Sequence, residues 1–156
     1  MDVNTFEKLR GERMKIAIVQ SRFNREITDG LAAGAVKALK EAGADEPPIF
    51  LVPGAFEIPL VCQKLAQTNR FNGIVAVGAV VKGETAHFEY VAKGVCDGLV
   101  KATLDNEFPI AFGVLMTYDF NQAKKRAENN ENNKGYEAAM ALVEELTILE
   151  KINEIF

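Results

Sequence analysis

Four short apolar runs alternate with helical segments along the chain, and this alternation constrains the fold more than any other feature. The runs are rich in β-branched residues, as strands buried on both faces are, and they span 15–21, 48–54, 73–81 and 109–117. Apolar residues recur at helical spacing in 27–43, 57–67, 87–106, 119–129 and 134–156. Strands that alternate with helices join through right-handed crossovers. The pattern therefore predicts an α/β fold with a four-stranded parallel sheet and helices on both faces.

The chain is predicted to form a single domain over residues 1–156, because no linker, repeat or low-complexity segment divides it. Residues 1–13 are interpreted as an N-terminal arm, and 3–9 within it is a candidate edge strand. Apolar residues make up 48% and charged residues 26%, as in soluble globular proteins. The net charge of −4 provides no broad basic surface, so nucleic acid is not an expected partner.

The sequence predicts a cytoplasmic location. The N-terminal residues are charged and lack the apolar run of a signal peptide, and no stretch approaches the ~18–20 apolar residues of a membrane span. Cys62 and Cys96 lie far apart without metal-ligand spacing, so both are predicted to be reduced thiols and no metal is expected.

Aromatic, acidic and hydroxyl side chains follow the predicted strands, at the edge of the sheet where ligands bind in such folds. Phe23 follows the first strand, and Phe56 and Glu57 follow the second. Thr85 and His87, the only histidine of the chain, follow the third. Phe112 lies in the fourth strand, and Arg126 lies in the helix after it. Their convergence predicts a site for a flat polar ring and a phosphate, with a histidine to transfer protons.

Each of these residues also has an ordinary structural interpretation. A lone histidine near a helix start is often a surface or capping residue. Phe23 and Phe56 suit a hydrophobic core, and Glu57 suits the positive end of a helix dipole. Thr85 suits a helix N-cap. No glycine-rich nucleotide loop is present, so no nucleotide cofactor is indicated.

Five segments of the chain are distinctive: SRFN at 21–24, VPGAFEIP at 52–59, GAVVKGETAHFEYVA at 78–92, PIAFGVL at 109–115 and NKGYEAA at 133–139. In their order and spacing they resemble the 6,7-dimethyl-8-ribityllumazine synthase family of riboflavin biosynthesis. The resemblance implies a flavodoxin-like three-layer fold. It implies a transferase that condenses 5-amino-6-(D-ribitylamino)uracil with 3,4-dihydroxy-2-butanone 4-phosphate and releases phosphate and water. Neither a cofactor nor a metal is implied.

The same resemblance implies roles for individual residues. His87 is implied as the acid/base, Phe23 as the platform under the pyrimidine, Glu57 as the partner of the ribityl hydroxyls, and Arg126 as the group that closes on the phosphate. The residues implied to bind the substrates are Phe23, Ala55, Phe56, Glu57, Ala79, Val80, Val81, Glu84, Thr85, Phe112, Arg126 and Lys134. Glu84 and Thr85 are the implied phosphate seat, with Glu84 expected to contribute only its backbone because its carboxylate would repel the anion.

The resemblance also implies a homopentamer with active sites between subunits, in which Phe112 reaches the site of a neighbour. Some family members assemble further into a sixty-subunit shell, and riboflavin synthase is a possible partner. Two segments depart from the family pattern. Residues 127–135 read AENNENNKG, which removes two glycines and a lysine, and residues 117–120 read TYDF in place of a threonine-rich turn. Two alternatives stay open: a riboflavin synthase of the archaeal type, and a non-catalytic shell protein that binds flavin or lumazine.

Overall fold

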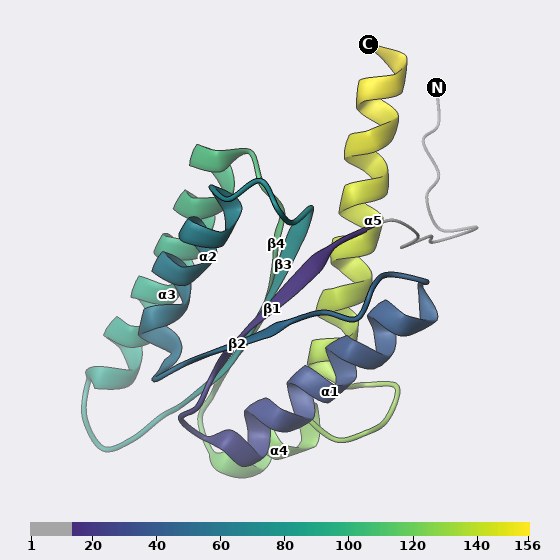
Figure 1. Ribbon diagram of the computed structural model, residues 1–156. Coiled ribbons are helices and arrows are strands. Elements are labelled where there is room, and N and C mark those ends of the chain that lie inside the picture. The colour runs from purple at the N-terminus through teal and green to yellow at the C-terminus, as the bar shows by residue number, and fades with distance from the viewer. Residues whose placement is uncertain (1–13) are drawn as a thin grey trace.

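A parallel four-stranded sheet forms the centre of the molecule (Figure 1). The computed structural model describes residues 14–156, so the candidate edge strand at 3–9 lies outside the described residues. The strands are β1 Ile16–Ser21, β2 Ile49–Val52, β3 Gly73–Val81 and β4 Ile110–Thr117. Their order is β2-β1-β3-β4, and every neighbouring pair is parallel. The predicted four-stranded parallel sheet is confirmed.

Helices lie on both sides of the sheet, and the expected flavodoxin-like three-layer fold is confirmed. In Figure 1, α2 and α3 cover one face, and α1, α4 and α5 lie toward the other. The bounds are α1 Arg25–Glu41, η1 Ala55–Glu57, α2 Ile58–Ala66, α3 His87–Asn106, α4 Phe120–Arg126 and α5 Lys134–Ile155. Among the described residues, no helix combines the length and apolar character needed to cross a membrane.

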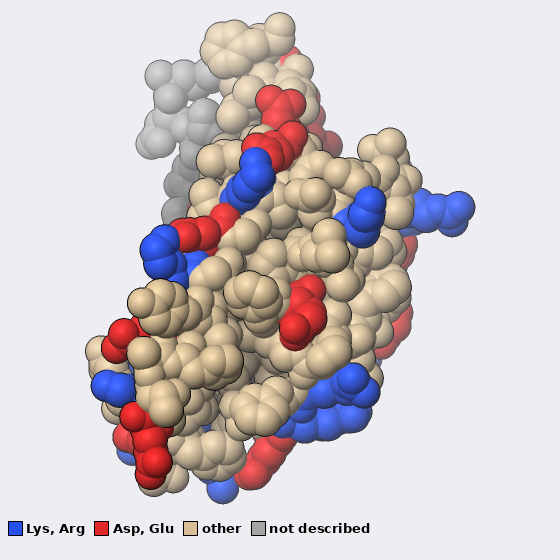
Figure 2. All heavy atoms as spheres, turned by 90° about the vertical axis from the view of Figure 1, so that its left-hand side faces the viewer, with Lys and Arg blue, Asp and Glu red and all other residues tan. Residues whose placement is uncertain are grey.

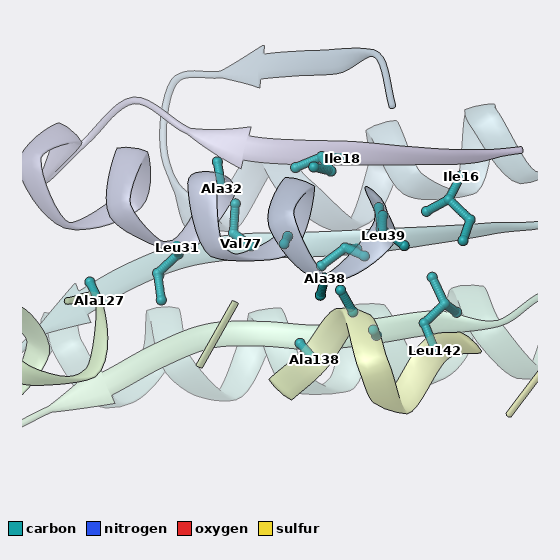
Figure 3. Close-up of a cluster of buried hydrophobic side chains, with 14 of the residues drawn as sticks. Ile16, Ile18, Leu31, Ala32, Ala38, Leu39, Val77, Ala127, Ala138 and Leu142 are labelled. Carbon is teal, nitrogen blue, oxygen red and sulfur yellow. The ribbon is translucent and has the colours of Figure 1, made fainter. Parts of the chain in front are cut away.

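Two hydrophobic layers separate the sheet from its helices, as the two-residue period of a strand requires. Along β1, Ile16 and Ile18 belong to the layer under α1 and α5, whereas Ala17 and Val19 belong to the layer under α2 and α3. Figure 3 shows the first layer, where Leu142 of α5 lies below Ile16. The apolar stripes predicted for the helices are buried in these layers, apart from the far end of α5.

The first turn of α5 packs closely on α1. A Cβ at Gly135 would lie only 1.9 Å from the backbone oxygen of Leu31, so only glycine fits there without a backbone shift. Asn133, two residues before Gly135, is 2% exposed. Its Oδ1 accepts a hydrogen bond from Tyr136 N at 3.0 Å, which caps the helix, and its Nδ2 donates to Gly30 O at 3.1 Å. The NKG part of the family-like segment therefore joins α5 to α1.

Part of the sheet and part of the helical surface remain exposed in the single chain. The prediction that helices cover the sheet is correct for its centre, but the edge strand β2 leaves Ile49, Phe50 and Leu51 exposed because α2 packs on β1 and β3. The face of α2 and α3 also carries exposed apolar side chains, and Figure 2 shows that much of it is formed by uncharged residues.

Candidate active site

A pocket of about 740 Å³ opens at the carboxyl ends of β1, β2 and β3. Its volume falls within the range of small-molecule sites. Its lining includes five of the side chains singled out from the sequence, which come from three successive strand ends: Phe23, Phe56, Glu57, Thr85 and His87. Ala55 and the segment Ala79–Val81 also line it. We call this cavity the catalytic pocket.

The turn between β1 and α1 holds Phe23 at the wall of the catalytic pocket. Phe23 N donates to Pro53 O at 3.1 Å, and Arg22 N donates to Val52 O at 2.8 Å, so the turn is bonded to the end of β2. On the other side, Asn24 Nδ2 donates to Ala79 O at 3.0 Å. Asn24 has φ 57° and ψ 47°, a left-handed conformation that asparagine tolerates better than most residues. The Phe23 ring is 71% exposed in the single chain and is therefore available to a ligand.

Glu57 and Phe56 lie in the short η1 helix that follows β2. Gly54 N donates to Glu57 Oε2 at 2.9 Å, which fixes the carboxylate at the pocket wall. The other carboxylate oxygen, Oε1, takes no part in this hydrogen bond. The Phe56 ring packs on α3 at Gly94, where a Cβ would lie 2.7 Å from the ring. Gly94 therefore makes room for Phe56 beside the pocket.

The segment between β3 and α3 contributes polar groups. His87 is the first residue of α3, and its backbone N donates to Thr85 Oγ1 over a long 3.4 Å. The N-cap is Ala86, which provides no side-chain hydrogen bond. Thr85 is therefore not the N-cap of α3, and its contact with His87 N lies within an exposed loop. Backbone N–H groups at a helix start attract anions. Glu84 is exposed between Gly83 and Thr85 and does not itself line the pocket.

The other three predicted binding residues lie in a second pocket. Phe112, Arg126 and Lys134 line a cavity of about 320 Å³ beside β4, together with the strand residues Gly113–Thr117. Arg126 Nη1 donates to Gln122 O at 2.9 Å, and Lys134 forms an ion pair with Glu137 at 2.7 Å. The two pockets share no lining residue, so a single chain does not bring Arg126 and His87 into one cavity. We call this second cavity the β4 pocket.

Several residues of the catalytic pocket were not singled out from the sequence. Phe88, Tyr90 and Val91 line it from the first turn of α3. The helical spacing of Tyr90 and Val91 relative to His87 is the signal that places them on the same side of the helix. No signal in the sequence marked Asn24 as a link between two walls. Among residues 14–156, no cluster of His, Cys, Asp and Glu is arranged to hold a metal ion.

Comparison with known proteins gives the family. The model of the 6,7-dimethyl-8-ribityllumazine synthase family matches residues 13–150. The chain belongs to this family. It is 48% identical over 142 residues to 6,7-dimethyl-8-ribityllumazine synthase 1 of Caulobacter vibrioides, and the match covers 90% of this chain and 93% of that protein. Membership of the lumazine synthase family makes the protein a transferase of riboflavin biosynthesis.

Proposed function

We propose that the catalytic pocket condenses 5-amino-6-(D-ribitylamino)uracil with 3,4-dihydroxy-2-butanone 4-phosphate to form 6,7-dimethyl-8-ribityllumazine. The observation that carries this proposal is the convergence of Phe23, Glu57, Thr85 and His87 on one cavity at three neighbouring strand ends. The pocket has an exposed aromatic ring at Phe23, a fixed carboxylate at Glu57 and the start of α3, which are complementary to a flat ring, a polyol and a phosphate respectively.

In this proposal the pyrimidine stacks on Phe23, and its polar edge faces the backbone of Ala79–Val81. This segment pairs with β4 along one side, and Ala79 O already accepts a hydrogen bond from Asn24, so the backbone groups available to the ring are the others that face away from β4. Glu57 accepts hydrogen bonds from the ribityl hydroxyls through the oxygen that Gly54 leaves free. Phe56 and Ala55 complete the wall beside the sugar chain.

His87 acts as the acid and base of the reaction. The amine and the ketone form an imine with loss of water, the phosphate leaves, and ring closure with loss of a second water produces the lumazine. Each step moves a proton at near-neutral pH, which imidazole is suited to give and take. His87 lies beside Thr85 at the helix start, and both residues line the pocket that Phe23 also lines. Holding the two reactants together supplies a large part of the acceleration.

We further propose that the site is completed between subunits of a homopentamer. The catalytic pocket has no arginine or lysine in its lining, and the β4 pocket has two cations and an aromatic ring without an acid or base. Facing the β4 pocket of one subunit toward the catalytic pocket of its neighbour gives one site with Arg126 and Lys134 for the phosphate and Phe112 for the ring. The exposed residues of β2 and of the α2 and α3 face supply apolar surface for such contacts.

Further assembly follows from the same proposal. The candidate strand at 3–9 adds to the free edge of β2 in an adjacent subunit, which hides that edge. Pentamers assemble into a sixty-subunit shell, and riboflavin synthase is the proposed partner enzyme because it consumes the lumazine. The cytoplasm is the proposed location, where Cys62 and Cys96 stay free thiols as they are in the structure.

One assay separates this function from its alternatives. The purified protein is given both substrates, and lumazine is followed by its absorbance. Lumazine formation that requires both substrates supports the proposal. Riboflavin formed from lumazine alone would instead indicate a riboflavin synthase, and tight binding of lumazine without turnover of either kind would indicate a non-catalytic carrier.

A further inference from the structure

The turn after β4 departs from the family pattern, and nothing in the proposed reaction uses it. Tyr118 lies in this turn with its side chain 73% exposed. Its backbone N donates to Gln122 Oε1 at 2.9 Å, and Thr117 Oγ1 donates to Asp119 O at 2.9 Å. Asp119 Oδ1 caps α4 by accepting from Gln122 N at 2.8 Å. The backbone that carries the Tyr118 ring is therefore fixed by several hydrogen bonds.

The Tyr118 ring contacts both ends of the segment that follows β3. Lys82 Nζ lies over the ring, 5.7 Å from its centroid, at a distance typical of a cation–π contact. The Phe88 ring lies 6.4 Å from the Tyr118 ring, centroid to centroid, at an interplanar angle of 41°. Phe88 also lines the catalytic pocket. Tyr118 thus reaches across to the two residues that bracket the Gly83–His87 loop.

The bracketed loop has few other contacts. Its residues are exposed, and a Cβ built on Gly83 would meet no atom within 4 Å. The described hydrogen bonds near it are few. Lys82 N donates to Thr117 O at 2.9 Å at the end of the sheet, and His87 N donates to Thr85 Oγ1 over a long 3.4 Å. Ala86 O accepts from Glu89 N at 3.1 Å and from Tyr90 N at 3.5 Å, bonds that belong to the first turn of α3. A loop with so little packing loses conformational freedom when it binds a ligand, and that loss weakens binding unless another group restrains the loop beforehand.

We propose that Tyr118 is a positioning residue for the phosphate seat of the catalytic pocket. By holding Lys82 and Phe88, its ring restrains the loop that carries Thr85 and His87. The inference rests on the proposed assignment of the phosphate to this loop. The pyrimidine platform, Phe23, is held from other elements, so Tyr118 acts on the phosphate substrate and not on the pyrimidine.

Three variants of the full-length protein test this role by steady-state kinetics. Tyr118→Thr removes the ring, Lys82→Met removes the cation, and Tyr118→Phe keeps a ring of the same size. We expect Tyr118→Thr to raise the KM for the butanone phosphate roughly 3- to 20-fold, and Lys82→Met to raise it less, because one ring contact remains. We expect the KM for the pyrimidine to change less than about twofold, and Tyr118→Phe to recover most of the wild-type behaviour.

Hydrogen exchange of the backbone amides provides a readout that does not depend on turnover. We expect the amides of residues 83–87 to exchange faster in Tyr118→Thr than in the wild type, while those of β1 and β3 keep their protection. A wild-type protein that makes no lumazine would overturn the proposed function but leave this exchange result standing. A Tyr118→Thr protein with unchanged exchange and unchanged KM for the phosphate substrate would overturn the role of Tyr118 alone, and so would equal losses for both substrates.

Discussion

At the scale of single residues, the strongest claim concerns His87. Replacing His87 with alanine removes the proposed proton-transfer group but leaves Phe23 and Glu57 in place. We expect kcat to fall by a factor between ~10 and ~10⁴, with the KM for the ribitylaminouracil nearly unchanged. Lumazine absorbance measures both quantities. An unchanged kcat would contradict the role of His87 as the acid and base.

Cys62 illustrates a residue whose environment makes it chemically inert. Burial raises the pKa of its thiol from 9.0 to about 12. The folded-state pKa lies above the unfolded one, so the unfolded chain ionises first as the pH rises. The free energy of unfolding therefore keeps its full value below about pH 9, as far as this thiol is concerned, and falls as the pH rises toward 12. In a Cys96→Ser protein, we expect a thiol reagent at pH 8 to leave Cys62 unmodified until urea unfolds the chain. Rapid modification of the folded protein would contradict the burial of Cys62.

Residue patterns explain what could be predicted of the site and what could not. Phe23, Glu57 and Thr85 directly follow strand ends, so the alternation of strands and helices was enough to predict that they converge. The same pattern predicts Phe112 and Arg126 at this rim, but the structure places them in the β4 pocket because β4 is the other edge strand of the sheet. Which cavity a residue of an edge strand lines depends on packing that the sequence pattern does not contain.

At the scale of elements, the junction of α1 and α5 depends on Asn133. Its amide donates to Gly30 O and to Glu128 O, and its oxygen caps α5. Asn133→Ala would remove these three hydrogen bonds from the junction, at a cost of about 2–4 kcal/mol. We expect the thermal unfolding midpoint to fall by roughly 5–15 °C at equal protein concentration.

Asn132→Ala is the matched control for that variant. Asn132 is exposed, and its described hydrogen bond is made by its backbone N to Asn130 Oδ1, which the substitution keeps. We expect it to unfold within about 2 °C of the wild type, since surface changes of this kind usually cost less than ~0.5 kcal/mol. Equal shifts for the two variants would show that Asn133 does not hold the junction.

The elements themselves were largely predictable, whereas the contacts between them were not. The TYDF turn was recognised as unusual from the sequence, but its contact with Lys82 and Phe88 joins elements that are more than 25 residues apart along the chain. Similarly, the loop at 127–133 is unusual in sequence because it lacks two glycines of the family pattern. Its actual support comes from Asn130, whose Oδ1 accepts from Asn132 N at 2.8 Å, and from the buried Asn133.

At the scale of the whole molecule, the two pockets are separate in one chain, and the proposed function joins them across a subunit interface. The central claim is that one subunit supplies His87 and the next supplies Arg126. Light scattering should give a mass of at least five chains of 17.1 kDa, and an active monomer would be incompatible with a shared site. Arg126→Ala alone should weaken the binding of the butanone phosphate roughly 10- to 150-fold, because a charge-assisted hydrogen bond to the phosphate is lost.

Mixing two impaired variants tests the shared site most directly. His87→Ala and Arg126→Ala chains are co-expressed in equal amounts, and lumazine formation is measured at a butanone phosphate concentration well below saturation. In a ring with sites between neighbours, roughly a quarter of the sites pair an intact catalytic pocket with an intact β4 pocket, so the mixture should recover up to about a quarter of wild-type activity. If each site lay within one chain, every site would carry one of the two substitutions. A mixture no more active than the average of the separate variants would contradict the shared site.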